Sequence, residues 1–239
     1  MNPRLLLPIA LMQGLWLLHR TPSLPAPRGK SGRVGPRYVP ALRLAGVGDS
    51  VMVGTGVRDQ RHSLTASYAR LLHARMDCAV EWRVHGCVGA TSGQVLREVA
   101  PAVRRAHVYL LSCGVNDATR GIAPAEFAQN LDDILVALRQ RSPRATVLYG
   151  GLPPLASFPA MPWPLKSLLA ERVAELRAAA AKVVERHRRV FCFQFPPAMS
   201  PEHFASDGFH PHESACERWA AGLLDLWPPT LPGVTSRSR

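Results

Sequence analysis

The sequence predicts a three-layer α/β/α domain built on a parallel sheet of about five strands. Short apolar runs that suit buried strands alternate along the chain with longer stretches whose apolar residues recur at helical spacing. This alternation implies right-handed crossovers and a parallel sheet covered by helices on both faces. The 239 residues, 47% of them hydrophobic, suffice for one such domain with extensions.

The first 40 residues are expected to precede this domain. Residues 1–20 contain the apolar stretch LLLPIALMQGLWLL, which has the length of a signal-peptide core but is followed at once by His19 and Arg20, without a clean cleavage site. The stretch is short for a membrane span. An anchor lying in the membrane interface and a leader packed on the domain are the other interpretations. We expect membrane association through this segment, with the cytoplasmic or secreted side left open.

Residues 21–40 are basic and rich in Pro, Gly and Ser, which predicts a flexible linker. The net charge is +12, and seven Lys and Arg residues precede Asp49, the first acidic residue. A basic arm of this kind suits anionic lipid head groups, and a solubilising role fits equally well. No nucleic-acid-binding motif accompanies the charge, so nucleic acid is not an expected partner.

The domain is expected to span residues 41–227. Its strands are inferred from short apolar runs, of which ALRLAGV before Gly48 and HVYLLSC before Gly114 are the clearest. The expected strands, in chain order, are Ala41–Val47, Ala79–Val84, His107–Cys113, Ala145–Tyr149 and Val190–Phe193.

The helices between these strands are inferred from apolar residues that recur every three or four positions. The stretch after Pro124 shows this best, because its apolar residues form one stripe and proline suits a first helical turn. The expected helices are His62–Arg75, Thr91–Val99, Pro124–Arg139, Leu165–Arg188 and His212–Trp227, and residues 228–239 are expected to form a disordered tail.

The five cysteines are odd in number and show no CxxC spacing, so neither a disulfide framework nor a zinc site is expected. Cys113 and Cys192 lie in apolar runs and are expected to pack in the core. Packing is also the expected role of Cys87, although it lies close to residues with a possible catalytic function.

Polar and glycine-rich clusters follow four of the expected strands. They are Gly48-Asp49-Ser50, the segment 85–91, the segment 114–117 and the segment 206–211. In parallel α/β sheets, ligands bind at the carboxyl ends of the strands. We therefore expect all four clusters to lie along one rim of the sheet.

The four clusters together supply what acyl transfer requires, namely a nucleophile, a base, a group that orients the base and donors for the oxyanion. Ser50 can be the nucleophile and His210 the base, with Asp207 three residues earlier to orient its ring. The Ser50 and Gly89 backbone N–H groups and the Asn116 amide can stabilise the oxyanion.

Each of these residues also has an ordinary structural interpretation. Ser50 could cap a helix, Gly89 could only form a turn, and Asn116 could cap the next segment. Asp207 and His210 could form a local hydrogen bond, and Gly86 competes with Gly89 for the oxyanion role. Their joint occurrence at strand ends favours catalysis. Asp49 and Asp117, which neighbour the site, are expected to be structural.

The order of these clusters resembles that of the SGNH hydrolases, also called GDSL-like lipases and esterases. Segments 48–51, 88–91, 114–117 and 207–210 resemble the four sequence blocks of that family, and the similarity spans about residues 43–226. The resemblance implies a flavodoxin-like fold and an ester hydrolase without metal or other cofactor. It also implies a Ser50-His210-Asp207 triad, with Ser50, Gly89 and Asn116 as oxyanion donors. Val51 stands where the motif has Leu, and His85-Gly86-Cys87 departs from the second block.

A long apolar loop, GGLPPLASFPAMPWP at residues 150–164, follows the fourth expected strand. It could form an active-site wall that suits an acyl chain, or only cover the edge of the core. Small acyl esters or lysophospholipids are the expected substrates, with an O-acetyl sugar ester as the alternative. A non-catalytic, membrane-tethered binding module on the same fold is the alternative from another functional class.

Overall fold

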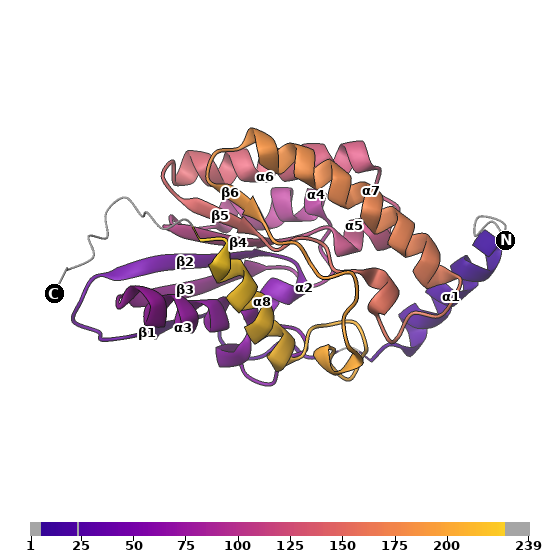
Figure 1. Cartoon of the computed structure of the whole chain (residues 1–239), viewed down its shortest axis with the longest axis horizontal. Helices are drawn as coiled ribbons and strands as arrows, with labels where there is room; N and C mark the ends of the chain where they lie inside the picture. The colour runs from indigo at the N-terminus through magenta and orange to yellow at the C-terminus, as the bar shows by residue number, and fades with distance from the viewer. Residues whose placement is uncertain (1–5, 23, 228–239) are drawn as a thin grey trace.

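A six-stranded sheet forms the centre of the protein, in the order β1-β3-β2-β4-β5-β6 (Figure 1). The computed structural model describes residues 6–22 and 24–227. Strands β2 to β6 run parallel, and β1 pairs antiparallel with β3 at one edge. The predicted fold class is confirmed. The strands are β1 (Ser31–Val34), β2 (Ala41–Gly48), β3 (Ala79–Gly86), β4 (Val108–Ser112), β5 (Thr146–Tyr149) and β6 (Val190–Cys192).

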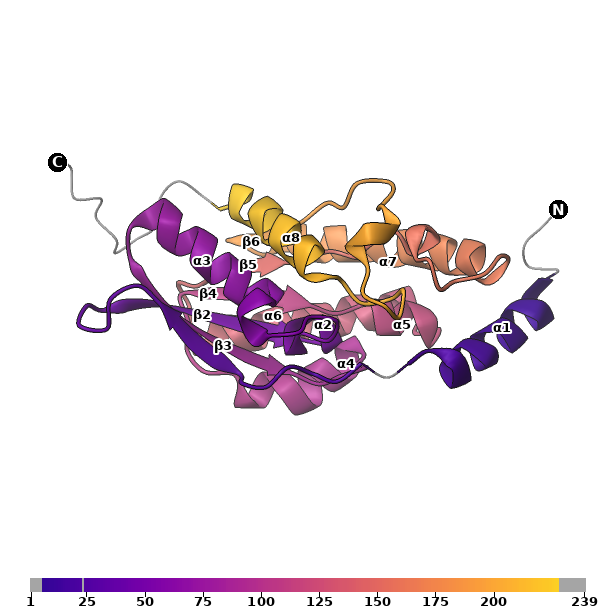
Figure 2. The same ribbon diagram turned by 90° about the horizontal axis from the view of Figure 1, so that it is seen from below.

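Helices cover both faces of the sheet (Figures 1 and 2). Helices α4, α5, α6 and α7 lie on one face, while α2, α3 and α8 lie on the other; α1 lies beyond the sheet. Their bounds are α1 (Leu7–Arg20), α2 (Ser50–Val53), α3 (Leu64–Met76), α4 (Ser92–Gln94), α5 (Val115–Thr119), α6 (Pro124–Arg141), α7 (Leu165–Arg186) and α8 (Glu213–Asp225). A π-helical turn (Val95–Val99) continues α4, and short 3-10 turns occupy Gln60–His62, Ala100–Ala102, Leu155–Ser157 and Pro201–His203.

Strand β4 contributes alternate side chains to the two hydrophobic cores, one on each face of the sheet. Tyr109 and Leu111 pack with the helices of one face, and Val108 and Leu110 pack with those of the other. Because successive residues of a strand point to opposite faces, a strand covered on both sides must be apolar throughout. The run HVYLLSC meets this requirement, and all five residues of β4 are buried.

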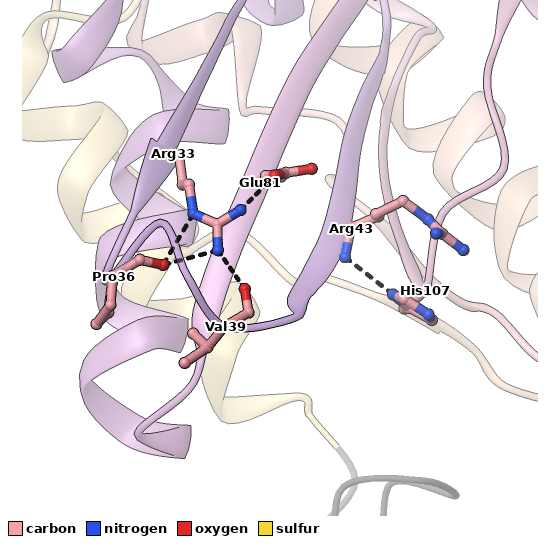
Figure 3. Close-up of polar contacts among 6 residues, drawn as sticks. All are labelled: Arg33, Pro36, Val39, Arg43, Glu81 and His107. Carbon is pink, nitrogen blue, oxygen red and sulfur yellow. Dashed lines mark hydrogen bonds and ion pairs between the residues drawn. The ribbon is translucent and has the colours of Figure 1, made fainter.

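The expected linker at residues 21–40 is corrected in part, because Ser31–Val34 form β1. The Arg33 guanidinium donates to the carbonyl oxygens of Pro36 (2.7 Å) and Val39 (2.5 Å) and pairs with Glu81 on β3 (Figure 3). In β2, the Arg43 N–H donates to Nδ1 of His107 at 2.9 Å (Figure 3). Two of the seven basic residues expected in an arm therefore belong to the sheet.

The apolar stretch near the N-terminus forms α1, which packs against the beginning of α7 (Figure 1). The Gln13 side chain links the two segments, since its Nε2 donates to the Trp163 carbonyl (2.8 Å) and its Oε1 accepts from the Leu165 N–H (3.2 Å). Within the described residues, no helix combines the length and hydrophobicity that a membrane crossing requires. Residues 1–5 of the expected anchor and the expected tail at 228–239 lie outside the described residues.

Candidate active site

The four polar clusters meet at the carboxyl ends of the parallel strands. Ser50 follows β2 and begins α2, Gly89 follows β3, and Asn116 lies in α5, directly after β4. Asp207 and His210 lie in the loop between β6 and α8. All five residues line one cavity, whereas Gly86, the alternative to Gly89, does not.

Ser50, His210 and Asp207 form a continuous chain of hydrogen bonds. Nε2 of His210 lies 2.9 Å from Oγ of Ser50, and Nδ1 of the same ring lies 2.5 Å from Oδ2 of Asp207. A carboxylate only accepts hydrogen bonds, so this contact assigns the ring proton to Nδ1 and leaves Nε2 free to accept the serine proton. This is the geometry in which an imidazole can act as a base toward a hydroxyl.

The Asp207 carboxylate is held by its own loop. Its Oδ1 accepts from the backbone N–H groups of Phe209 (2.9 Å) and His210 (3.0 Å), while Oδ2 contacts the imidazole. Burial by itself would raise the pKa of Asp207, but the hydrogen bonds from the His210 ring and the two backbone N–H groups outweigh it and lower the pKa. Asp207 is therefore ionised at neutral pH and favours a protonated imidazole beside it.

Asp49, rather than Ser50, caps the short helix α2. Its Oδ1 accepts from the Val51 N–H and from the Ser112 hydroxyl, both at 3.1 Å. The capping interpretation of Ser50 therefore does not hold, and its hydroxyl is left for His210. Burial raises the pKa of Asp49 to about 6, although these two hydrogen bonds oppose the shift.

Only glycine fits at the position before Asp49. Gly48 has a φ of +149°, and a Cβ there would lie 1.9 Å from the Ser112 carbonyl oxygen of the neighbouring strand. The close approach also brings the Asp49 N–H to that oxygen at 3.1 Å. The sharp bend after β2 thus turns Ser50 toward the rim of the sheet.

Three residues that line the cavity, Ser50, Gly89 and Asn116, have N–H groups with a hydrogen left for a ligand. Among the described residues, no acceptor is found for the backbone N–H groups of Ser50 and Gly89. The Asn116 amide donates one hydrogen to the Ala90 carbonyl at 3.0 Å, which leaves its second hydrogen for a ligand. Gly86 belongs to β3, pairs with Gly48 and does not line the cavity, so the geometry favours Gly89 as the donor.

Two further residues, Arg120 and Ser92, fix the loop after β3 that carries Gly89, and the sequence did not indicate either of them. The Arg120 guanidinium donates to the Gly89 carbonyl (2.9 Å) and to Oε1 of Gln94 (3.2 Å). The Ser92 hydroxyl and N–H both donate to Asp117, at 2.5 and 2.9 Å. These contacts connect α5 to the loop after β3 and so fix Asn116 relative to Gly89; no local sequence pattern signals bonds between such distant residues.

The cavity in front of Ser50 has a volume of about 1070 Å³ and a mostly apolar lining. Small-molecule pockets generally span roughly 300–1,000 Å³, so this cavity is at the upper end of that range. The apolar loop at 150–164 serves both roles considered for it: Phe158 and Met161 line the cavity, whereas Leu152 and Leu155 are buried in the core.

All five cysteines are unpaired. Cys113 is buried, and burial raises the pKa of its thiol well above the usual value. Cys87 and Cys192 are partly buried and pack against the core formed with α6 and α7. Within the described part of the chain, no three His, Cys, Asp or Glu side chains are grouped as metal ligands would be.

The protein thus has an α/β/α fold, and a serine, a histidine and an aspartate are linked by hydrogen bonds at the carboxyl ends of its strands. The sequence profile of the GDSL-like Lipase/Acylhydrolase family matches residues 47–218. The chain belongs to this family, as the resemblance implied. A search of curated protein sequences found no match.

Several solved structures share the fold at low sequence identity. The lipase Lip_vut3 from a goat rumen metagenome is 16% identical, with a TM-score of 0.64 over 77% of this chain and 97% of that one. The esterase EstA from Pseudoalteromonas sp. is 15% identical (TM-score 0.56; 77% and 94%). A carbohydrate esterase family 2 enzyme with a carbohydrate-binding domain, from Corynascus thermopiles, is 14% identical (TM-score 0.60; 80% and 67%). At such identities these likenesses establish the fold alone.

Proposed function

We propose that the protein is a serine ester hydrolase that cleaves small acyl esters or lysophospholipids through an acyl-enzyme on Ser50. The observation that carries the proposal is the hydrogen-bonded chain from Ser50 through His210 to Asp207 at an apolar cavity. Membership of the GDSL-like lipase/acylhydrolase family supports ester hydrolysis as the reaction. In this proposal, Ser50, His210 and Asp207 form the catalytic triad and no metal takes part.

In the first half of the reaction, Oγ of Ser50 attacks the ester carbonyl carbon while Nε2 of His210 takes its proton. The negative charge passes to the carbonyl oxygen, which accepts from the N–H groups of Ser50, Gly89 and Asn116. His210 then gives its proton to the alcohol oxygen as the carbon–oxygen bond breaks. The alcohol leaves, and the acyl group stays on Ser50.

In the second half, water attacks the acyl carbon and gives a proton to His210. The oxyanion forms again at the same three donors, and its collapse breaks the bond to Oγ of Ser50, which regains its proton from His210. The acid is released and the free serine is restored. Asp207 stabilises the imidazolium in both halves and remains ionised, as its lowered pKa requires.

A fluorophosphonate probe tests the proposal directly, because it forms a covalent adduct with an activated serine. We expect mass spectrometry to find the adduct on Ser50 and to find none in the Ser50→Ala variant. The protein should also hydrolyse p-nitrophenyl esters from the acetate to the butyrate, and this activity should persist after EDTA treatment. A protein that neither reacts nor turns over would favour the non-catalytic binding module.

His210→Ala should lower kcat by orders of magnitude while leaving the melting temperature close to that of the wild type. The ring is partly exposed, and its polar contacts are those with Ser50 and Asp207. Kinetics with p-nitrophenyl butyrate, together with thermal unfolding, measure both quantities. Near-normal turnover would remove His210 from the mechanism.

A carbohydrate O-acetylesterase is the second candidate, because a carbohydrate esterase is among the proteins with a similar fold. Deacetylation of a sugar uses the same nucleophile, base and oxyanion donors. The apolar lining of the cavity favours an acyl chain over a sugar. A panel containing p-nitrophenyl esters, a lysophospholipid and an acetylated xylose oligomer separates the two, since a deacetylase would prefer the last by kcat/KM.

We also propose that α1 associates with a membrane surface. Ile9, Met12 and Trp16 lie on one side of α1 and are at least half exposed, and the Arg20 guanidinium lies over the Trp16 ring. The exposed basic residues Arg28 and Lys30 follow and suit anionic head groups. We expect sedimentation with vesicles that contain phosphatidylglycerol, weakened by salt and by Trp16→Ser. Equal sedimentation with purely zwitterionic vesicles would contradict the electrostatic part.

A further inference from the structure

The large cavity in front of Ser50 is not formed by the catalytic domain alone. Residues of α1 and of the segment that follows it line the same cavity as Ser50 and His210. These residues precede the range 47–218 that matches the family. The part of the chain that matches the family therefore does not include this wall, although the wall belongs to the same cavity as Ser50.

The two sides of α1 differ in what they face. Ala10, Gly14 and Leu17 recur at a spacing of three to four residues, which places them on one side of the helix, and all three line the cavity. Ala10 and Leu17 are buried. Met12 lies on the other side, does not line the cavity and is 73% exposed.

Specific contacts fix α1 in this position. The Gln13 amide bonds the Trp163 carbonyl and the Leu165 N–H, which joins α1 to the start of α7. Leu165 and residues of the next turn of α7 also line the cavity. Helix α1, the start of α7 and the apolar loop before it thus all contribute residues to the apolar lining of this cavity.

Gly14 leaves space in the middle of this wall. A Cβ placed on Gly14 would meet no atom within 4 Å, so a larger side chain could extend into the cavity without displacing a neighbour. Gly14 is also the residue with the smallest side chain on the cavity side of α1. The free depth of the cavity next to α1 therefore depends on this position.

We infer that α1 is the far wall of an acyl-chain site and that Gly14 determines the chain length that the site accepts. This inference rests on the proposed ester hydrolase and names its substrate class as esters of medium to long fatty acyl chains. The carbonyl lies at Ser50, and the chain extends through the apolar enclosure toward α1. Each methylene that enters it leaves water, which stabilises the bound ester.

The test is a series of p-nitrophenyl esters from acetate to palmitate. For the wild type, kcat/KM should rise by about fourfold for each added methylene until the chain reaches α1. Gly14→Phe should shift the optimum to shorter chains, reduce kcat/KM for the longest good substrate at least tenfold and leave acetate unchanged; Gly14→Leu should show a smaller shift. Met12→Phe, on the opposite side of α1, is the matched control and should keep the wild-type profile.

A binding experiment tests the role of α1 in the cavity independently of ester hydrolysis. In the Ser50→Ala background, a fluorescent C16 fatty acid should bind, and adding Gly14→Phe should weaken its binding at least tenfold whereas Met12→Phe should not. Absence of all ester cleavage would refute the proposed function, yet this binding result would still test the wall. Cleavage of short esters with an identical chain-length profile in the wild type and both folded Gly14 variants would overturn the inference, as would a wild-type optimum at acetate.

Discussion

Three aspartates border the site; each has different partners, and the pKa of one is lowered whereas the pKa of the other two is raised. Asp207 bonds the His210 ring and two backbone N–H groups, which lowers its pKa. Asp49 is buried and forms no ion pair with any residue that the structure describes, and burial raises its pKa to about 6. Asp117 bonds Ser92, and burial raises its pKa as well. Of the three carboxylates, Asp207 is the one in direct contact with the His210 ring; as expected from the sequence, the other two contact backbone N–H groups.

Asp49→Asn should remove a pH dependence of stability. The folded pKa of Asp49 lies above its unfolded value of about 3.9. Its contribution to stability is therefore complete below pH 4 and is lost as the pH rises through 6. The shift of about two units corresponds to about 3 kcal/mol. Urea unfolding at pH 4 and pH 7 measures the free energy of unfolding of both proteins. Between these pH values the stability of the variant relative to the wild type should increase by about 3 kcal/mol, because Asn carries no charge and still accepts from the Val51 N–H. A difference that does not change with pH would contradict the raised pKa.

Asn116→Ala should lower kcat more than it raises KM. The hydrogen bond from Asn116 to the oxyanion is strongest in the transition state, and loss of one such donor reduces kcat by about 10²–10³. Steady-state kinetics with p-nitrophenyl butyrate measure both parameters. The melting temperature should be recorded as well, since Asn116 also bonds Ala90. A change confined to KM would argue against the oxyanion role.

At the scale of elements, the loop after α2 supports the loop that carries His210. Gly56 has a φ of +97°, and a Cβ there would lie 2.8 Å from the Pro211 carbonyl oxygen and 2.9 Å from Cβ of His210. The two loops are far apart in sequence but approach each other closely at His210. The position of the imidazole therefore depends on a glycine that the sequence showed only as part of a small-residue stretch.

Gly56→Ala should reduce kcat/KM by about tenfold to a hundredfold, because a displacement of the base by even 1 Å costs about 10²-fold. Gly29→Ala is the matched control: Gly29 also has a positive φ of +89°, but a Cβ there meets no atom within 4 Å. Esterase assays and thermal unfolding of both variants separate displacement of His210 from backbone strain. Equal activity in the two variants would contradict the proposed support.

The sequence predicted those elements whose signals are local. The five parallel strands are apolar runs, and four of the five expected helices agree with the structure within a few residues. The expected helix Thr91–Val99 instead divides into α4 and a π-helical turn. Strand β1 was missed because it depends on partners outside its own segment: Arg33 bonds Glu81, and a Cβ on Gly32 would collide with the Trp82 ring.

The position of the candidate site could also be predicted from local signals, but some of the hydrogen bonds within the site could not. Parallel strands bring their carboxyl ends to one rim, so residues at strand ends could be grouped before any coordinates. Sequence spacing could not decide that Asp49 rather than Ser50 caps α2, because both residue types cap helices. Arg120 gave no signal, since it acts through a bond to Gly89, thirty-one positions away.

At the scale of the whole molecule, the segment before the family domain contributes to both ends of the protein. Strand β1 extends the sheet at one edge, where Arg33 joins three parts of the chain (Figure 3). Helix α1 lies at the other end of the molecule (Figure 2) and contributes residues to the lining of the cavity. Residues 6–22 and 24–40 are therefore part of the folded structure to a greater extent than their composition indicates.

Arg33→Ala should reduce the free energy of unfolding by about 1.5–3 kcal/mol, because its hydrogen bonds involve a charged donor and two carbonyl oxygens. Arg33→Lys should recover little of this loss, since an ammonium group cannot reproduce the fork of the guanidinium. Arg37→Ala, at an exposed position close by, should change stability by less than about 0.5 kcal/mol. Chemical denaturation measures all three, and equal losses for Arg33→Ala and Arg37→Ala would contradict this role.

The placement of α1 separates two properties that a single active site usually combines. In the proposed mechanism, bond cleavage depends on residues within the range that matches the family, whereas a short preceding segment supplies part of the cavity lining. Replacing or exchanging that segment would change which molecules fit without altering a single reacting group. Selectivity in this protein can thus evolve, or be engineered, independently of the chemistry.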